Sequence, residues 1–192
     1  MAGLRERRKA WTRSEIQQHA LRLFRERGYN ATTVDQIAEA AEVSQSTFFR
    51  YFATKEDLVL RDEYDRRIVD EVLLQPADLP PIQVVRNAIQ AVYARSSAEE
   101  LAQEQERFQL IRSTPELRPR MLDTLTEGIM LMADALAERA GREKGDFAAR
   151  TFAGALIGVS LSSMLAAGED GAADFISLYD AGLELLEKGL PL

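Results

Sequence analysis

Two helix-start signals, eleven residues apart, constrain the fold of this chain more than any other feature. Thr33 and Gln36 have the spacing of a capping box, in which the threonine oxygen and the glutamine side chain each accept a backbone hydrogen bond from the other residue. Ser44 can cap a second helical pattern after a turn through Glu42 and Val43. The pattern predicts two short helices joined by a tight turn, a helix-turn-helix.

The residues of this segment divide into an inward and an outward set. The apolar residues that we expect to pack inward are Val34, Ile37, Ala38, Val43 and Phe48. The residues left to face a nucleic-acid groove are Gln45, Ser46, Thr47, Phe49 and Arg50. The helix N-termini at Thr33 and Ser44 and the ammonium of Lys55 suit phosphates, whereas Phe49 can lie against a thymine methyl. We therefore predict a DNA-binding surface.

Helix signals recur along the whole chain, and no segment has the alternation typical of a strand. Thr12 and Glu15 form a capping box for a helix over 12–27, which Gly28 ends, and Thr54 caps a long helix over 54–74. Further helices are predicted over 82–96, 99–112, 115–140, 146–167 and 172–188, with caps at Ser97 and Thr114. The fold class is therefore all-α, with about nine helices.

The charge distribution suggests two parts. The net charge is −7, but residues 1–60 carry ten basic and eight acidic residues, while the remainder carries fourteen and twenty-three. Such asymmetry favours a small module that meets a polyanion, joined to a larger acidic part. We predict a helix-turn-helix domain with an N-terminal arm over 1–54 and a helical domain over 55–192. The basic arm either enters a minor groove or is a solvated tail.

The composition excludes several classes of chemistry. The absence of cysteine excludes a disulfide framework, a thiol nucleophile and cysteine-based metal sites. The single histidine, His19, lies on a patterned helix where packing is expected, as it is for Trp11. We expect no catalytic residues, no cofactor and no metal site.

Two further patterns bear on the location of the protein. The basic N-terminus is followed by no apolar run of the signal-peptide type, so a cytoplasmic protein is expected. The segment Thr151–Gly168 is uncharged for 18 residues, but it contains three glycines and four hydroxyls. We interpret it as a helix buried on all sides by protein, and not as a membrane span.

The segment from residue 20 to residue 58, with its ending FFRYFATKEDL, resembles the TetR family of bacterial repressors. The resemblance implies that the family's DNA-contact positions are Thr33, Thr47, Phe49, Tyr51 and Lys55. The sequence departs from the family pattern at Glu42, where glycine is common, and at Phe49, where tyrosine is usual. A positive φ at Glu42 would cost about 1 kcal/mol.

A helix-turn-helix of this size reads few base pairs, so tight binding requires two copies on a palindromic site. Gly154, Gly158 and Ser162 have the four-residue spacing that lets another helix approach closely. Apolar stripes in the last helix comprise Phe175, Leu178, Leu183, Leu185 and Leu186. These two helices predict a homodimeric four-helix bundle, as the resemblance also implies. The alternative is that both helices belong to the core of one chain.

The helices between these parts are the candidate for a ligand pocket. The residues that we expect to line it are Tyr93, Phe108, Ile111, Arg112, Leu125, Ile129 and Met132. The phrase RFQLIRSTPELRPRML resembles the mycofactocin-regulator subgroup, which implies acyl-CoA-like ligands. Arg112, Arg118 and Arg120 suit phosphate or carboxylate, although Arg118 and Arg120 could instead pair with acidic neighbours such as Glu116 and Asp123.

The combined hypothesis is a ligand-responsive repressor that binds palindromic operator DNA as a homodimer and is released by an amphipathic effector such as an acyl-CoA. The predicted helix over 54–74 would be a continuous lever between the phosphates and the pocket. Three alternatives remain open at this point: a sensor of neutral aromatic or drug-like compounds, a helical enzyme acting on a thioester or ester, and a helical interaction module that does not bind DNA.

Overall fold

The computed structural model describes residues 4–61, 63–167 and 172–191. Within these ranges the regular elements are all helical, so the predicted all-α fold is confirmed. In order they are α1 (Leu4–Arg27), α2 (Val34–Ala40), α3 (Gln45–Tyr51), α4 (Asp57–Leu60), α5 (Glu63–Leu74), α6 (Pro81–Ala94), α7 (Ala98–Ser113), the 3-10 turn η1 (Pro115–Leu117), α8 (Arg118–Arg139), α9 (Phe147–Ala166) and α10 (Ala172–Glu187).

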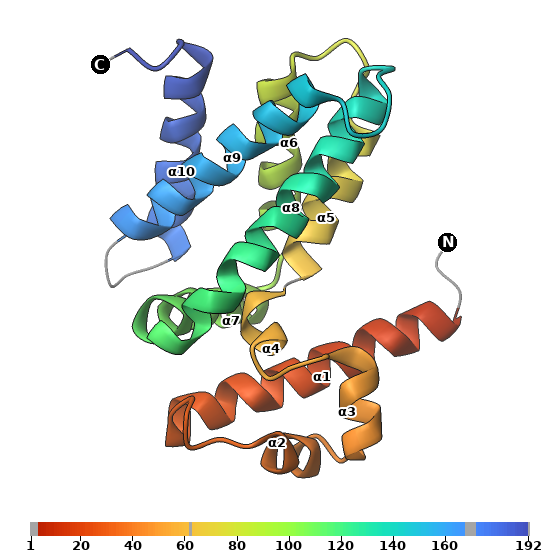
Figure 1. The fold of residues 1–192 in the computed structure, drawn as a ribbon, viewed down its shortest axis with the longest axis vertical. Coiled ribbons are helices and arrows are strands. Elements are labelled where there is room, and N and C mark those ends of the chain that lie inside the picture. The colour runs from red at the N-terminus through yellow and green to blue at the C-terminus, as the bar shows by residue number, and fades with distance from the viewer. Residues whose placement is uncertain (1–3, 62, 168–171, 192) are drawn as a thin grey trace.

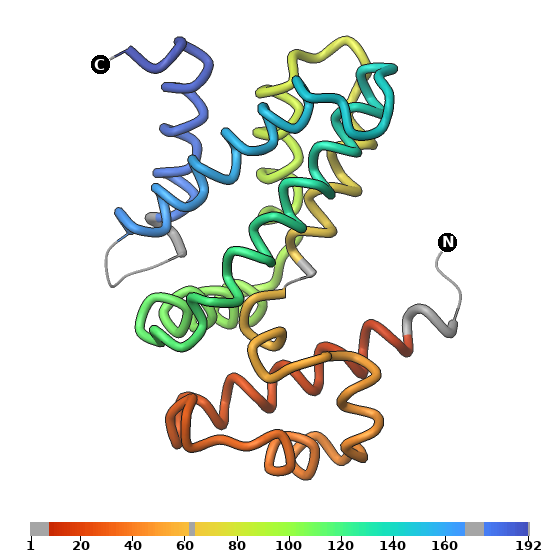
Figure 2. The backbone as a smooth tube through the Cα atoms, in the orientation of Figure 1, coloured from red at the N-terminus to blue at the C-terminus, as the bar shows by residue number. Residues whose placement is uncertain are grey.

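The buried side chains form two clusters, one at each end of the molecule. Helices α1 to α4 enclose the first cluster, with α2 and α3 at the extremity farthest from α9 and α10 (Figures 1 and 2). Helices α5, α6 and α8 to α10 enclose the second. Leu58, Val59 and Leu60 belong to the first cluster, so we propose a domain boundary after α4 instead of at residue 54. Leu117, from η1, is also buried in the first cluster.

Local side-chain bonds explain where the short helices start. Thr33 and Gln36 form both bonds of the predicted capping box at α2. The Ser44 hydroxyl accepts from the Thr47 amide at the start of α3, and Ser97 caps α7 in a box with Glu100. These caps satisfy amides that a helix leaves without an internal partner, and they confirm the three predicted helix starts.

The start of α1 differs from the prediction. The helix begins at Leu4, and the Thr12 hydroxyl donates to the Arg8 carbonyl, 3.0 Å away, instead of capping. A mid-helix threonine commonly bonds the carbonyl four residues back in this way. The basic arm is therefore helical from Leu4. The expected packing of Trp11 is wrong, because its side chain is 65% exposed.

The predicted helix over 54–74 is interrupted. Thr54 accepts from the Asp57 amide as expected, but α4 ends at Leu60 and Arg61 has an extended backbone (φ −105°, ψ 113°). Arg61 is fixed by ion pairs with Asp57 at 3.3 Å and with Glu127 of α8 at 2.7 Å. The ion pair with Glu127 is a tertiary contact that outweighs the helical pattern of the segment, and the prediction of a continuous lever is wrong.

Glu42 in the turn between α2 and α3 has φ +52°. Because Cβ disfavours this left-handed conformation, we expect Glu42→Gly to raise the free energy of unfolding by about 1 kcal/mol. Urea denaturation followed by circular dichroism measures this change. Glu42→Ala removes the same charge but keeps the Cβ, so it serves as the control; an equal gain from both variants would contradict the conformational explanation.

Candidate DNA-binding surface and effector pocket

Helix α3 presents one polar face while its other face is anchored in the first core. Phe48 and Phe52 are fully buried, and they contact each other with ring centroids 5.9 Å apart. Phe49 is 51% exposed and meets Phe48 edge-on. The side chains that project into solvent from α3 are those of Gln45, Ser46, Phe49 and Arg50, with Thr47 partly covered. The expected outward set thus lies together on one exposed surface.

Bonds within the helix-turn-helix hold several of these side chains in place. Gln45 donates to the carboxylate of Asp35 on α2. The Ser44 hydroxyl lies 2.9 Å from that of Ser46 and donates to that of Thr47 at 3.0 Å. The Arg50 guanidinium lies over the Tyr51 ring, 5.4 Å from its centroid. Side chains held before binding lose less conformational entropy when they meet a partner.

Lys55 has a different environment from the one expected. Its ammonium donates to the carbonyls of Tyr29 at 2.9 Å and Thr32 at 3.1 Å, and it lies 4.0 Å from the centroid of the Tyr29 ring. Burial lowers the pKa of Lys55, although the neighbouring Glu56 opposes this shift. Since an ammonium has three donors, two of which are engaged here, Lys55 fixes the loop before α2 in addition to any contact with phosphate.

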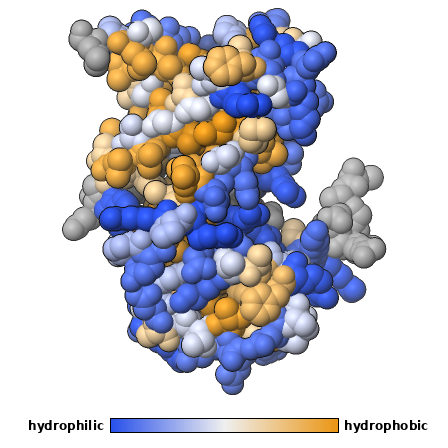
Figure 3. All heavy atoms as spheres, viewed as in Figure 1, coloured by the Kyte–Doolittle hydropathy of each residue, from blue (hydrophilic) through white to orange (hydrophobic). Residues whose placement is uncertain are grey.

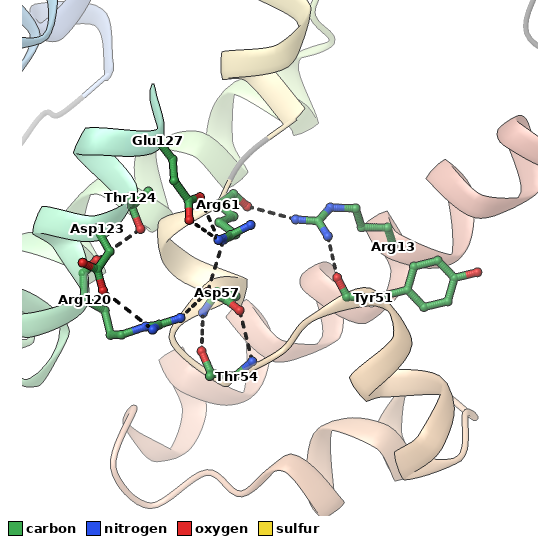
Figure 4. Close-up of polar contacts among 9 residues, drawn as sticks. All are labelled: Arg13, Tyr51, Thr54, Asp57, Arg61, Arg120, Asp123, Thr124 and Glu127. Carbon is green, nitrogen blue, oxygen red and sulfur yellow. Dashed lines mark hydrogen bonds and ion pairs between the residues drawn. The ribbon is translucent and has the colours of Figure 1, made fainter. Parts of the chain in front are cut away.

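Arg13 of α1 supports the end of α3, and the sequence reading did not identify it. Its guanidinium donates to the Tyr51 carbonyl at 2.8 Å (Figure 4). The same guanidinium stacks over the Phe52 ring, 4.2 Å from the ring centroid. It also donates to the Arg61 carbonyl at 3.5 Å. Arg13 therefore joins α1, the end of α3 and the interruption after α4. Its bonded partners lie 38 and 48 residues further along the chain, so no local pattern gave a signal for this role.

A polar cluster formed by Thr54, Asp57, Arg61, Arg120 and Glu127, here called the Asp57 cluster, links the two cores (Figure 4). The buried Asp57 carboxylate accepts from the Thr54 amide at 3.1 Å and pairs with Arg61. Arg120 of α8 approaches Asp57 at 3.5 Å and Asp123 at 3.8 Å. Arg120 thus follows the acidic-neighbour alternative, whereas Arg118 is exposed. The cluster ties α4 directly to α8.

A cavity of about 180 Å³ lies among α5 to α10. Five of the predicted residues line it, namely Tyr93, Phe108, Ile111, Leu125 and Met132. Ile129 instead packs against the second core. The cavity is smaller than the roughly 300–1,000 Å³ of common ligand pockets, so it fits a compact group or one segment of a longer ligand.

Arg112 does not line this cavity, in contrast to the prediction. Its guanidinium donates to the Ala167 carbonyl at the end of α9, 2.5 Å away, in a small hollow behind Phe108 and Phe175. The terminal carbonyls of a helix lack partners within it, which explains why a cation is held there. The polar residues that do line the cavity include Glu104 and Arg107 of α7, which the sequence reading missed. Their i, i+3 spacing beside Phe108 was the available signal.

Helix α9 leaves one face open, so the expectation that it is buried on all sides is wrong for the single chain. Gly158 and Ser162 are exposed, and a Cβ placed at Gly154 or Gly158 would meet no atom within 4 Å. Figure 3 shows apolar side chains gathered over the end of the molecule that contains α8 and α9, while the opposite end is mainly hydrophilic. By length and composition alone, helix α9 is also apolar enough to cross a membrane.

The last helix contributes less to this open face than predicted. Phe175 and Leu183 are buried in the second core of their own chain, and Leu178 and Leu186 are partly buried against it. Leu185 is 48% exposed. Phe175 contacts Phe108 and Tyr179 ring to ring, which explains its burial. Phe175 and Leu183 are therefore removed from the proposed partner-facing set.

A helix-turn-helix with an exposed second helix, joined to a helical body that contains a cavity, is the architecture of a ligand-binding transcriptional regulator. Residues 16–61 match the family model of bacterial regulatory proteins of the tetR family, and residues 79–191 match that of the MftR C-terminal domain. The chain belongs to the TetR family. Family and relatives are transcriptional regulators, not enzymes.

Two relatives and one solved structure illustrate the likeness. The chain is 36% identical over 151 residues to the HTH-type transcriptional regulator TcmR of Streptomyces glaucescens. The matched segment covers 75% of this chain and 67% of TcmR. It is 28% identical over 187 residues to the mycofactocin biosynthesis transcriptional regulator MftR of Mycobacterium tuberculosis, covering 96% and 93%. Thermus thermophilus FadR, a TetR family repressor solved with lauroyl-CoA, superposes with a TM-score of 0.54 at 29% identity, covering 94% of this chain and 95% of FadR.

Proposed function

We propose that the protein is a cytoplasmic repressor that binds a palindromic operator as a homodimer and releases it when a hydrophobic or amphipathic effector occupies the cavity. The observation that carries this proposal is the surface of α3, where Gln45, Phe49 and Arg50 project from a helix fixed by two buried phenylalanines. Such a short helix fits the major groove, where arginine and glutamine side chains distinguish base pairs.

The open face of α9 supports the dimer. Gly154 and Gly158 leave space for a second helix at close range, and exposed apolar residues such as Phe147 and Leu165 continue the same helix. An exposed apolar patch of this kind is typical of a protein–protein contact surface, which supports the proposed dimer. A two-fold dimer also matches a palindromic site, since one helix-turn-helix reads only a few base pairs.

The effector proposal rests on the cavity and on the FadR likeness. FadR was solved with lauroyl-CoA, and the apolar lining here suits an acyl chain. The hollow that holds Arg112 shares Phe108, Met164 and Phe175 with the cavity, so an anionic end of a longer ligand lies within reach of that guanidinium. A sensor of neutral aromatic compounds is the second candidate, favoured by the aromatic residues of the lining.

The function is tested by selecting duplexes from a random pool and measuring affinity for the selected sequence by fluorescence anisotropy. We expect a palindrome bound tightly by two chains, and a weaker complex after lauroyl-CoA is added. Binding to random duplexes with equal affinity would contradict operator recognition. A tight complex that no acyl-CoA weakens, but a neutral aromatic compound does, would favour the second candidate.

Arg50→Ala should weaken binding to the selected operator by about 1–3 kcal/mol and relax the base preference at one position per half-site. The reason is that Arg50 is the cation of α3 and is exposed on its outer face. Competition with single-base operator variants measures the effect. Lys55→Ala is the matched comparison, and we expect it to weaken all sequences alike; an equal loss on random and selected duplexes for Arg50→Ala would assign it to the phosphates.

A further inference from the structure

Glu104 and Arg107 form a buried ion pair in the wall of the cavity. Their residues are 4% and 8% exposed, and both line the cavity. The Arg107 guanidinium donates to Glu104 through Nε at 2.9 Å and through Nη2 at 2.5 Å. The two charges of a buried pair have both lost their contact with water, so the pair is stable only when the two groups lie close together in good hydrogen-bonding geometry. It is therefore a fixed polar feature in an otherwise apolar wall.

The same guanidinium reaches into the DNA-binding unit. Arg107 Nη1 donates at 3.0 Å to the carbonyl of Val59, a fully buried residue of α4. Helix α4 ends one residue later, so its last carbonyls lack partners within the helix. Arg107 thus contacts Glu104 and the Val59 carbonyl at once, and connects the cavity wall to the short helix that follows the helix-turn-helix.

The remaining lining describes the kind of ligand that suits the cavity. Aromatic rings reach it from four helices, in Tyr64, Tyr93, Phe108, Phe175 and Tyr179. A phenol is neutral at physiological pH, and burial raises the pKa of Tyr64 and of Tyr179 further above that range. Glu104 already balances the charge of Arg107, and Asp65 adds a second carboxylate to the lining. An anionic group buried here would be repelled by these nearby carboxylates, whereas a neutral acceptor carries no net charge to be repelled.

We propose that the cavity takes a neutral aromatic group bearing a hydrogen-bond acceptor such as a carbonyl, and that Arg107 is the residue that recognises this acceptor. When Arg107 donates to the ligand, its bond to the Val59 carbonyl weakens, and this change transmits occupancy of the cavity to α4. The inference rests on the proposed repressor function and develops its second candidate effector, the neutral aromatic compound. A ligand without the acceptor fills the cavity but leaves the bond to Val59 in place. Affinity alone does not release DNA. The ligand must bind more tightly to the arrangement in which the Arg107–Val59 bond is weakened than to the arrangement that binds the operator.

Three probes with the same ring system separate the possibilities: naphthalene, 2-acetylnaphthalene and 2-naphthoate. Calorimetry on the full-length protein measures affinity, and anisotropy with the selected operator measures release. We expect 2-acetylnaphthalene to bind about tenfold more tightly than either of the others, the gain of one hydrogen bond to a charged donor. At equal occupancy we expect 2-acetylnaphthalene to weaken operator binding and naphthalene to leave it unchanged.

The double variant Glu104→Leu/Arg107→Met removes both charges together and leaves no unpaired ion in the core. We expect it to bind the ketone and the hydrocarbon equally. Because it also lacks the Arg107–Val59 bond, we expect it to bind the operator more weakly without ligand and to lose no further affinity when the ketone is added. Arg107→Lys, which keeps a cation beside Glu104, is the second variant, with an expected loss of most of the ketone preference. Arg112→Gln, on the same helix but outside the cavity, is the matched control and should retain the full preference.

Several outcomes would overturn the inference. Tightest binding of 2-naphthoate would make this an anion site, and equal affinity of the three probes for the wild-type protein would remove Arg107 from recognition. Binding of none of them would exclude the aromatic ligand class. In each case the operator measurement without ligand, and its response to lauroyl-CoA, report separately on the repressor function.

Discussion

A Gly158→Asp protein will sediment as a monomer and will lose tight binding to the palindromic operator. Gly158 lies on the exposed face of α9, where an added side chain meets no atom of its own chain. When the partner helix packs closely against this face, the carboxylate introduced by Gly158→Asp would be desolvated without a counter-ion, at a cost of several kcal/mol. The two-fold arrangement would bring two such charges near the same axis.

The loss of the dimer should reduce operator affinity by about a thousandfold, because the second half-site then no longer binds as part of the same molecule. Analytical ultracentrifugation and anisotropy with the selected duplex measure the two effects. Gln90→Asp adds the same charge at an exposed position of α6 and is the control. A Gly158→Asp protein that remains a dimer with normal operator affinity would show that α9 does not form the contact.

Asp57→Ala should lower the free energy of unfolding by about 2–4 kcal/mol. Asp57 is 3% exposed, caps the turn at Thr54 and faces two arginines, so its removal deletes several charge-assisted bonds together. The partly exposed arginines recover water, which keeps the expected loss below that of a fully buried pair. Urea denaturation measures this loss. Because Asp57 links α4 to Arg120 of α8, we also expect the effector to weaken operator binding less in this variant than in the wild-type protein.

Two control variants separate the contributions of Asp57. Asp57→Asn keeps an acceptor for the Thr54 amide and should recover about half of the lost stability. Arg120→Ala removes the contact with α8 but leaves the cap, and should cost less than about 1 kcal/mol because the guanidinium is 43% exposed. If Asp57→Ala were as stable as the wild-type protein, the cluster would have no structural role.

The sequence predicted best what is decided within a few residues. The caps at Thr33, Ser44 and Ser97 depend on partners three residues away, so they could be recognised directly. The break at Arg61 could not, because Glu127, from a helix distant in the chain, helps to hold it. Tertiary contacts of this kind override local helical preference.

The candidate sites follow the same distinction. The outward-facing residues of α3 could be predicted from the helical periodicity of a seven-residue segment, and their side chains are exposed on that face of the helix. The pocket required knowledge of how six helices pack, so apolar residues such as Tyr93 and Phe108 were found while Arg112 was misplaced. An arginine's sequence position does not reveal which distant carbonyl or carboxylate it reaches. The Glu104–Arg107 pair became visible only with the cavity beside it.

The burial of Leu117 among residues of α1 to α4 limits how freely the halves of this protein can be exchanged with those of other regulators. Leu117 is 1% exposed, and the partly buried Leu110, Ile111 and Met121 pack around the same cluster. The DNA-reading half therefore does not complete its own core. A chimera that joins residues 1–61 to the sensing half of another regulator inherits a void unless that half supplies an apolar residue at the same place. Recombination between such regulators is accordingly restricted to halves whose contact surfaces already fit.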